Sequence, residues 1–373
     1  MIHNDVRKKI NELIIRCAES GELARSLLEN FLRDNNFGSS LRREITDYFY
    51  CGIRFYGLLK KDTENFSCEK AYNVLESKNI NSPSILSEIS GFSLNFAETV
   101  LKNVDDIRPF FYRAPMSIRV NTLKTTKDLM LDKFSGKYNA SPTKVSPFGI
   151  TFNQHINVRQ LNEFKKGYFE IQDEASQLIP LLLDIKPGEK ILDFCAGTGG
   201  KALGISSLTF NTADIYIHDI NENRIQKAIN RSKKTGAKFK KLKKGQSRFF
   251  DKVLVDAPCS GVGSMRRDAD LPMRLDNNKL EKYTDLQKNI FNKALSYVKT
   301  GGLIAYVTCS FLEQENEKQV NNFLDNNHQL KLVKAVNILD KNISDKLSIQ
   351  DFFRTSPAFY GMDALFGSVF RVS

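Results

Sequence analysis

Hydrophobic and polar positions alternate with different periods along the chain. In residues 1–105, apolar residues recur every three or four positions, as at Ile10, Leu13, Ile14 and Cys17. This spacing puts them on one face of a helix, so the segment is predicted to form an all-α domain. Farther along, short apolar runs end in Gly, Pro or Asp, which is typical of buried strands.

Prolines interrupt the helical pattern just after that segment and indicate a domain boundary. We expect a small α+β module over 106–170, with strand patterns at 117–122 and 144–152 and a helix pattern at 126–134. Strand and helix patterns then alternate through 171–373, which predicts an α/β domain built on a mostly parallel sheet.

The strongest local pattern is a strand that runs into a glycine turn. Apolar residues over 191–195 precede Gly197, Gly199 and Gly200, and a helix pattern follows them. A strand, turn and helix of this kind open α/β nucleotide-binding folds, because glycines let backbone amides approach a ligand closely. Asp219 ends the next predicted strand, about where these folds bind a ribose diol. A cofactor that contains a nucleoside is therefore the first hypothesis.

Other interpretations of this turn compete with that hypothesis. A phosphate-binding P-loop fails, because Cys195 stands where its first glycine belongs and Ala202 replaces the Ser or Thr that holds magnesium. The dinucleotide fingerprint fits, since Gly197, Gly199 and Ala202 have its spacing. A nicotinamide-dependent oxidoreductase therefore remains an alternative, as does a tight turn with no ligand.

Composition changes the picture mainly through charge. The chain has 55 Lys and Arg against 43 Asp and Glu, which gives a net charge of +12. This surplus favours a polyanion such as RNA or DNA, although a basic composition can also serve solubility alone. Residues 231–244 contain eight basic residues and no acid, which fits either a polyanion contact or a solvated surface.

Cysteine usage and hydropathy bear on the compartment and on metal binding. Six cysteines without a Cys-x-x-Cys pair predict reduced thiols, with neither a disulfide framework nor a zinc site. No apolar run approaches the ~18 residues needed to span a bilayer, and the first residues lack the pattern of a signal peptide. We therefore expect a cytoplasmic protein with no membrane partner and no metal.

Two further predicted strands end in cysteine. Asp256-Ala257-Pro258-Cys259 closes one of them, and Thr308-Cys309 closes the next. Carboxyl ends of neighbouring strands share one rim of an open α/β sheet, so both thiols should lie near the glycine turn. A thiol, a carboxylate and a nucleoside cofactor suit methylation of cytosine, because a thiolate that adds to carbon 6 makes carbon 5 nucleophilic toward S-adenosylmethionine. Asp256 is placed to stabilise the ring as the thiolate adds.

Several motifs together resemble the RsmB, Nop2 and Sun family of RNA cytosine-5 methyltransferases over nearly the whole chain. They are Arg119-Val120-Asn121-Thr122-Leu123-Lys124, Gln172-Asp173-Glu174-Ala175-Ser176, Asp256-Ala257-Pro258-Cys259-Ser260-Gly261, Arg266-Arg267, and Thr308-Cys309-Ser310 followed by Glu315-Asn316-Glu317. The resemblance implies a Rossmann-like class I methyltransferase domain with a seven-stranded sheet over 171–373. It also implies a NusB-like RNA-binding domain over 1–105 and an RNA-recognition module over 106–170, as in the branch that acts on 16S rRNA.

The same resemblance implies roles for individual residues. Cys309 would be the nucleophile, Cys259 would help to release the product, and Asp256 would lie between cofactor and base. S-adenosylmethionine would be held by Cys195, Ala196, Gly197, Thr198, Gly199, Gly200 and Lys201, together with Asp219 and Asp256. RNA would be contacted by Arg119, Asn121, Lys124, Arg266 and Arg267. We also expect a monomer.

The cofactor loop departs from the family pattern, because Gly197-Thr198 stands where Ala-Pro is usual. The acid usually found after the third strand has no equivalent in 238–245, so the residue that contacts adenine is not assigned. The prediction is an RNA cytosine-5 methyltransferase. A non-catalytic RNA-binding factor in ribosome assembly is a second alternative beside the oxidoreductase.

Overall fold

The computed structural model describes residues 2–154, 156–243, 245 and 247–373, which form two compact units. One unit, called the helical unit below, contains the residues up to Arg113 together with Ser260–Lys282. The other, called the sheet unit, contains Ala114–Cys259 and Tyr283–Ser373. The sequence pattern gave no sign that 260–282 groups with the helical residues.

The helical unit is built from short amphipathic helices. On α1 (Asn4–Ser20) the apolar residues Ile10, Ile14 and Cys17 are buried, as their spacing predicts. The other helical segments are α2 (Ala24–Asp34), α3 (Ser39–Arg54), α4 (Tyr56–Lys61), α5 (Cys68–Ser77), α6 (Pro83–Ser90), α7 (Leu94–Leu101), η1 (Arg108–Phe111), η4 (Val262–Ser264) and α13 (Leu271–Arg274).

The pattern predicts one helix over 41–60, but the chain turns at Phe55 and forms α3 and α4 instead. Phe55 is fully buried, and its backbone leaves the helical region (φ −109°, ψ 35°). The turn brings Gly57 so close to α6 that a Cβ there would lie 2.1 Å from the carbonyl oxygen of Glu88. Tertiary packing therefore overrides the local helical pattern.

Polar contacts fix the segment Ser260–Lys282 within the helical unit. The backbone amide of Ala24 donates to Oδ2 of Asp270 (3.3 Å), and Nη2 of Arg54 donates to the carbonyl oxygen of Arg266 (3.0 Å). Arg266 in turn donates from Nε to the carbonyl oxygen of Tyr112 (3.1 Å) and from Nη2 to that of Arg113 (2.9 Å).

One expectation about the cysteines is corrected within the helical unit. The structure joins Cys51 to Cys68 by a disulfide, whereas the sequence predicts six reduced thiols. The two residues lie 17 positions apart, on α3 and α5, and packing of these helices brings them together. Cys17, Cys195, Cys259 and Cys309 are free.

The small module in the sheet unit is an antiparallel sheet with the strand order β2-β3-β1-β4. Its elements are β1 (Met116–Val120), α8 (Lys127–Tyr138), β2 (Ala140–Pro142), β3 (Gly149–Phe152), η2 (Val158–Gln160), α9 (Asn162–Lys165) and β4 (Phe169–Ile171). Met130 and Phe134 on α8 pack against the buried residues of the strands, including Phe169. The α+β pattern is therefore found, with shorter strands than the sequence suggests.

The larger sheet follows the path β10-β12-β9-β8-β5-β6-β7. Its strands are β5 (Lys190–Asp193), β6 (Asp214–Ile217), β7 (Lys240–Lys241), β8 (Phe250–Asp256), β9 (Val298–Thr308), β10 (Leu330–Val333) and β12 (Phe366–Val372). Strands from β7 to β9 are parallel, and β12 runs antiparallel to both β9 and β10. The short β11 (Phe353–Arg354) pairs with β12 and makes the sheet eight-stranded instead of seven-stranded. This is a Rossmann-like sheet with one antiparallel strand inserted.

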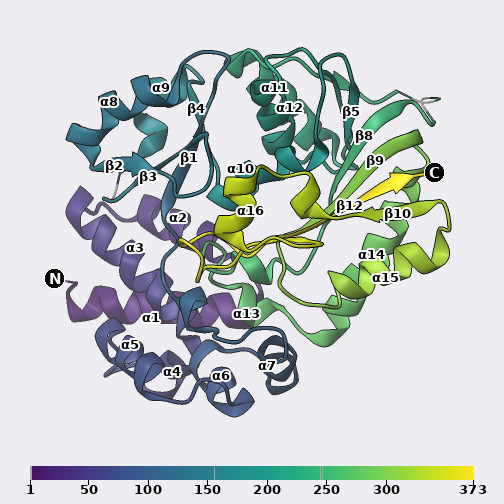
Figure 1. Cartoon of the computed structure of the whole chain (residues 1–373). Coiled ribbons are helices and arrows are strands. Elements are labelled where there is room, and N and C mark those ends of the chain that lie inside the picture. The colour runs from purple at the N-terminus through teal and green to yellow at the C-terminus, as the bar shows by residue number, and fades with distance from the viewer. Residues whose placement is uncertain (1, 155, 244, 246) are drawn as a thin grey trace. The chain divides into compact units, whose positions relative to one another are not determined.

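Side chains from successive strand residues enter two different cores. Ile191, Leu303 and Ala305 face a core shared with α11 (Gly200–Leu208) and α12 (Glu222–Thr235), while Leu192 and Ile304 face one shared with α14 (Asn277–Leu295) and α15 (Glu317–Asn326). Figure 1 shows α11 and α12 on one side of the sheet and α14 and α15 on the other. Further elements are α10 (Glu174–Leu178), η3 (Ile179–Leu183), η5 (Ala335–Asn337) and α16 (Lys341–Leu347).

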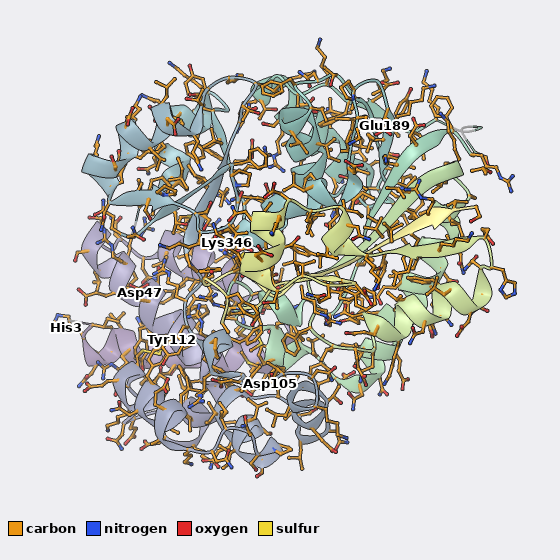
Figure 2. All side chains as sticks on the ribbon, in the orientation of Figure 1. His3, Asp47, Asp105, Tyr112, Glu189 and Lys346 are labelled. Carbon is orange, nitrogen blue, oxygen red and sulfur yellow. A yellow bond between two sulfur atoms is a disulfide. The ribbon has the colours of Figure 1, made fainter. Side chains whose placement is uncertain are left out.

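The two ends of the parallel strands differ in what they carry. Glu189, labelled in Figure 2, precedes β5 and marks the amino-terminal edge of the sheet. The glycine turn and both predicted catalytic cysteines follow the opposite, carboxyl-terminal edge. Among the described residues, no helix is long and apolar enough to cross a membrane.

Candidate active site

The glycine turn links β5 to α11 and is open on one side. Gly197 and Gly199 have positive φ values of 53° and 84°, a region that favours glycine. A Cβ at Gly199 would lie 2.9 Å from the Cβ of Ala228 on α12, whereas a Cβ at Gly197 or Gly200 would meet nothing within 4 Å. The free amides in the first turn of α11 are therefore accessible to a ligand that approaches the turn.

Asp219, which follows β6, holds the turn in place. Its Oδ2 accepts a hydrogen bond from the amide of Gly197 (2.9 Å), and its Oδ1 accepts one from the amide of Asn221 (2.8 Å). His218 strengthens the same corner, because its Nδ1 lies 2.8 Å from the carbonyl oxygen of Phe194 and its ring stacks on that of Phe194 at 4.5 Å. The sequence singled out Asp219, and it gave no sign of His218.

Two acids and a lysine form a partly buried cluster beside the turn. Lys201 on α11 is ion-paired with Asp256 at the end of β8. Burial alone would lower the pKa of Lys201, but the charge of Asp256 and its hydrogen bond raise it overall, and Asp193 and Cys309 act in the same direction. Cys195 lies in the same environment, where burial and then the charges of Asp193 and Asp256 raise the pKa of its thiol.

Asp193, the last residue of β5, is fully buried, and neither of its carboxylate oxygens makes a hydrogen bond of good geometry. Burial, and then the negative charge of Asp256, raise its pKa from an ordinary value of 3.8 to about 7, although Lys201 opposes this. The cluster of Asp193, Lys201 and Asp256 can therefore hold a proton near neutral pH.

The two thiols meet at this rim. Cys259 follows β8 and Cys309 follows β9, and their Sγ atoms lie 3.3 Å apart. The hydrogen bond to Cys309, burial, and the charges of Cys309 and Glu315 raise the pKa of Cys259 well above its ordinary value. The sequence expectation that both cysteines converge is confirmed by this distance. Within the described part of the chain, no three His, Cys, Asp or Glu side chains are grouped to hold a metal ion.

A glutamine on α14 joins the two cysteine loops. Nε2 of Gln287 donates to the carbonyl oxygen of Pro258 (3.0 Å) and to Oε1 of Glu315 (2.9 Å). Gln287 is fully buried, and its Oε1 accepts a hydrogen bond from Nε2 of Gln319 (3.2 Å). One side chain thus contacts the residue before Cys259 and the loop after Cys309.

A second polar link shapes the loop after Cys309. Thr308 donates from Oγ1 to Oδ1 of Asn316 (2.7 Å), and Nδ2 of Asn316 donates to the carbonyl oxygen of Ser310 (3.0 Å). Asn316 and Glu315 belong to one of the motifs that resemble the family, and the resemblance implied no role for them. Gln287 was missed altogether, because a glutamine within a predicted amphipathic helix carries no signal that it is buried.

The predicted RNA-contacting residues of the module take part in internal contacts. Arg119 is buried and donates from Nε to Oε1 of Gln172 (2.7 Å). Asn121 is buried and donates to the carbonyl oxygens of Gly167 and Thr235 (2.8 Å each). Lys124 is exposed, yet its Nζ reaches the carbonyl oxygens of Lys166 and Lys234. In the helical unit Arg266 is buried and Arg267 exposed. RNA contact by these five residues stays a prediction.

Comparison with known proteins gives matches of sequence and of fold. The family described as 16S rRNA methyltransferase RsmB/F matches residues 180–371. The ribosomal RNA small subunit methyltransferase B of Pectobacterium atrosepticum is 33% identical over 229 residues, which cover 59% of this chain and 53% of that protein. The chain thus spans about half the length of the curated relatives it matches.

Solved structures share the fold. The crystal structure of PH0851 superposes with a TM-score of 0.77 at 22% identity and covers 98% of each chain. A methyltransferase homolog protein from Pyrococcus horikoshii gives a TM-score of 0.64 at 24% identity, over 80% of this chain and 100% of that one. The sheet unit therefore has the Rossmann-like fold of methyltransferases.

Proposed function

The chain belongs to the RsmB/F family of 16S rRNA methyltransferases, and from that membership we propose that it transfers a methyl group from S-adenosylmethionine to carbon 5 of a cytosine in 16S rRNA. The observation that carries the proposal is the pair of thiols 3.3 Å apart, on the rim that also bears the glycine turn. Two converging thiols are required neither for hydride transfer nor for RNA binding without catalysis.

The residues at the turn fit S-adenosylmethionine. Space lies open in front of Gly197 and Gly200, and α11 presents its first amides there. Asp219 and the loop 195–201 would hold the nucleoside and the amino-acid part of the cofactor. When bound, S-adenosylmethionine supplies an electrophilic methyl group on a sulfonium.

Cys309 is proposed as the nucleophile, and its Sγ electron pair forms the bond to carbon 6 of the cytosine. The ammonium of Lys201 lies near enough to Cys309 for the charges of the two groups to interact. A proton shared between Asp256 and ring nitrogen 3 would offset the charge that develops on the ring, and the neighbouring Asp193 gives the cluster a proton to share near pH 7.

Cys259 is proposed to act after methyl transfer, when the carbon 5 proton leaves and the bond between Cys309 and carbon 6 breaks. Solvent water would take the carbon 5 proton as the ring double bond re-forms, and the electron pair of the bond between Sγ and carbon 6 would return to Cys309. The raised pKa of Cys259 keeps it a thiol at neutral pH, so its S–H can donate a hydrogen bond to the leaving sulfur. Its Sγ is already beside the sulfur that must be released.

The proposal also assigns roles to residues 1–170 and to the RNA-contacting side chains. We propose that 1–105 is a NusB-like domain and 106–170 an RNA-recognition module, that the protein acts as a monomer, and that Arg119, Asn121, Lys124, Arg266 and Arg267 help to place the RNA. A substrate in the ribosome agrees with the cytoplasmic location expected from the sequence.

The test uses two substitutions and one substrate, 16S rRNA with labelled S-adenosylmethionine. Cys309→Ala should reduce methyl incorporation to background. Cys259→Ala should instead accumulate an RNA adduct that migrates with the protein on a denaturing gel. Methyl transfer by Cys309→Ala at the parental rate would refute the mechanism. Thermal protection by NAD in place of S-adenosylmethionine would support the oxidoreductase instead.

A further inference from the structure

Lysine-bearing segments far apart in the sequence meet where the small module packs on α12. Nζ of Lys124 donates to the carbonyl oxygen of Lys166 (2.8 Å) and to that of Lys234 (2.7 Å). Nζ of Lys234 donates to the carbonyl oxygen of Phe164 (3.1 Å). Gly167 packs so closely here that a Cβ would lie 2.6 Å from the carbonyl oxygen of Lys234. The two backbones are therefore fixed against each other.

This junction is strongly basic. The segments 121–127, 163–170 and 231–238 together contain eight basic residues and two acids. Both acids are buried and already paired, Glu163 with Lys133 and Glu170 with Arg231 and Lys234. The acids therefore neutralise little of the charge that faces the solvent.

The remaining lysines point their charge outward. Lys165, Lys166, Lys233 and Lys238 are exposed, and no acidic side chain of the described residues lies within ion-pair distance of any of them. Together with Lys124 they are called the lysine surface. Ammonium groups carried on one fixed junction are suited to a regular polyanion, because the backbones that carry them need not be ordered on binding.

The lysine surface is connected to the glycine turn through α12. Arg231, two residues before Lys233, donates from Nη1 to the carbonyl oxygen (2.7 Å) and to Oγ1 (2.9 Å) of Thr198. Its Nη2 also donates to Oε2 of Glu170 on β4 (2.7 Å). One helix thus carries Lys233 of the lysine surface near its end and supports the cofactor loop along its side.

We propose that the lysine surface binds the phosphate backbone of the substrate RNA next to the target cytosine. This rests on the proposed function, which supplies the RNA. The run 231–244 was left open by the sequence between a polyanion contact and a solvated surface. In the structure, lysines of the small module lie beside this run. Within the run, four basic residues form internal ion pairs: Arg231, Lys234, Lys240 and Lys241. RNA is favoured over an anionic membrane because the chain belongs to a family of 16S rRNA methyltransferases.

The experiment compares two charge-matched triple variants of the full chain. The test variant is Lys165→Gln with Lys166→Gln and Lys233→Gln. The control variant is Lys293→Gln with Lys331→Gln and Lys341→Gln, three exposed lysines elsewhere in the sheet unit. Equilibrium binding to a 16S rRNA fragment is measured between 50 and 300 mM salt, together with single-turnover methyl transfer at saturating RNA.

The test variant should bind RNA about tenfold more weakly near 0.1 M salt, and the slope of log K against log salt should shrink by about 2 to 3, or about 0.7–0.9 for each lost phosphate contact. The control variant should stay within about twofold of the parent, and the test variant should keep its single-turnover rate at saturating RNA. These readouts separate lost phosphate contacts from a damaged site.

Equal RNA affinity and salt slope in the test variant and the parent overturn the lysine surface and leave the proposed methyltransferase standing. A parent protein that methylates no RNA but binds it through these lysines overturns the proposed function alone. Loss of binding to phosphatidylserine vesicles, with RNA binding unchanged, would assign the surface to a membrane and overturn the proposal.

Discussion

Asp193 is the residue whose ionisation should be visible in the stability of the protein. Its pKa of about 7 in the folded chain exceeds the ordinary 3.8, so the folded state binds its proton more tightly than the unfolded state does. Stability from this group is present in full below about pH 4 and is lost as pH rises through about 7. Each pKa unit corresponds to about 1.4 kcal/mol.

Asp193→Asn removes this titration and keeps the shape of the side chain. We expect the variant to gain stability relative to the parent between pH 5 and pH 8, in urea unfolding followed by circular dichroism. Asp251→Asn is the matched control at the other edge of the sheet. Burial would raise the pKa of Asp251, but hydrogen bonds from Lys190 and Lys299 lower it overall. The effect of Asp251→Asn on the free energy of unfolding should therefore be constant between pH 5 and pH 8. If the free energy of unfolding depends on pH in the same way for Asp193→Asn and for the parent, the raised pKa of Asp193 is wrong.

Gln287 should affect the rate more than the binding of RNA. Gln287→Met keeps the volume but loses the hydrogen bonds to Pro258 and Glu315, so the two cysteine loops are no longer joined. A displacement of reacting groups by about 1 Å can cost roughly a hundredfold in rate. We expect kcat to fall by about tenfold or more while KM for RNA changes less than about threefold. Parental kcat in Gln287→Met would show that the link is only structural.

Residue types in the sequence predicted which side chains meet at the rim of the sheet better than they predicted the residues that support them. Cys259, Cys309 and Asp256 are recognisable because few reactions need that combination. Arg119 and Asn121 illustrate the limit, since their side chains are buried in internal contacts and nothing in a single sequence distinguishes a buried arginine from an exposed one. His218 and Gln287 are polar residues whose role depends on partners distant in sequence.

At the scale of elements, the turn between β5 and α11 makes a testable contrast between neighbouring glycines. Gly199→Ala forces a side chain into a left-handed conformation and 2.9 Å from Ala228, so we expect a loss of about 1–3 kcal/mol in unfolding free energy. Gly200→Ala meets no neighbour and should fold at least as stably as the parent.

The two alanine variants should also differ in cofactor binding. The Cβ of Gly200→Ala enters the open side of the turn, so thermal protection by S-adenosylmethionine should decrease although stability does not. Differential scanning fluorimetry with and without the cofactor makes this comparison. Equal protection of parent and Gly200→Ala would place the cofactor elsewhere.

Long apolar strands and helices were predictable, and the short elements were not. β8, β9 and β12 follow clear apolar runs, so their existence and rim were evident from the sequence. β7 and β11 have two residues each, too few to show a period. The break between α3 and α4 depends on the close approach of Gly57 to Glu88, a contact that local propensity does not encode.

At the scale of the whole molecule, the basic surplus is confined to one unit. The residues of the helical unit include 21 basic and 20 acidic ones, whereas those of the sheet unit include 34 and 23. The overall +12 gave no indication of this division. If charge dominates RNA affinity, most of it must come from the sheet unit.

A charge-neutralising variant of the helical unit tests this division. Lys8→Gln, Lys9→Gln and Arg43→Gln together remove three exposed positive charges. We expect RNA affinity at 0.1 M salt to change by less than about threefold, compared with about tenfold for the lysine surface. A loss as large as that of the lysine-surface variant would show that the helical domain supplies phosphate contacts after all.

The pairing of β8 with β9 determines where the two cysteine loops begin. Asp256 lies opposite Val307 in that pairing, and Cys259 and Cys309 follow these paired residues by three and two positions. Adjacent strands lie about 4.8 Å apart, so the loops that leave β8 and β9 start close enough for their side chains to meet. The positions of the two thiols therefore depend on the core of the sheet, so substitutions that disturb the pairing of β8 with β9 should move the thiols apart.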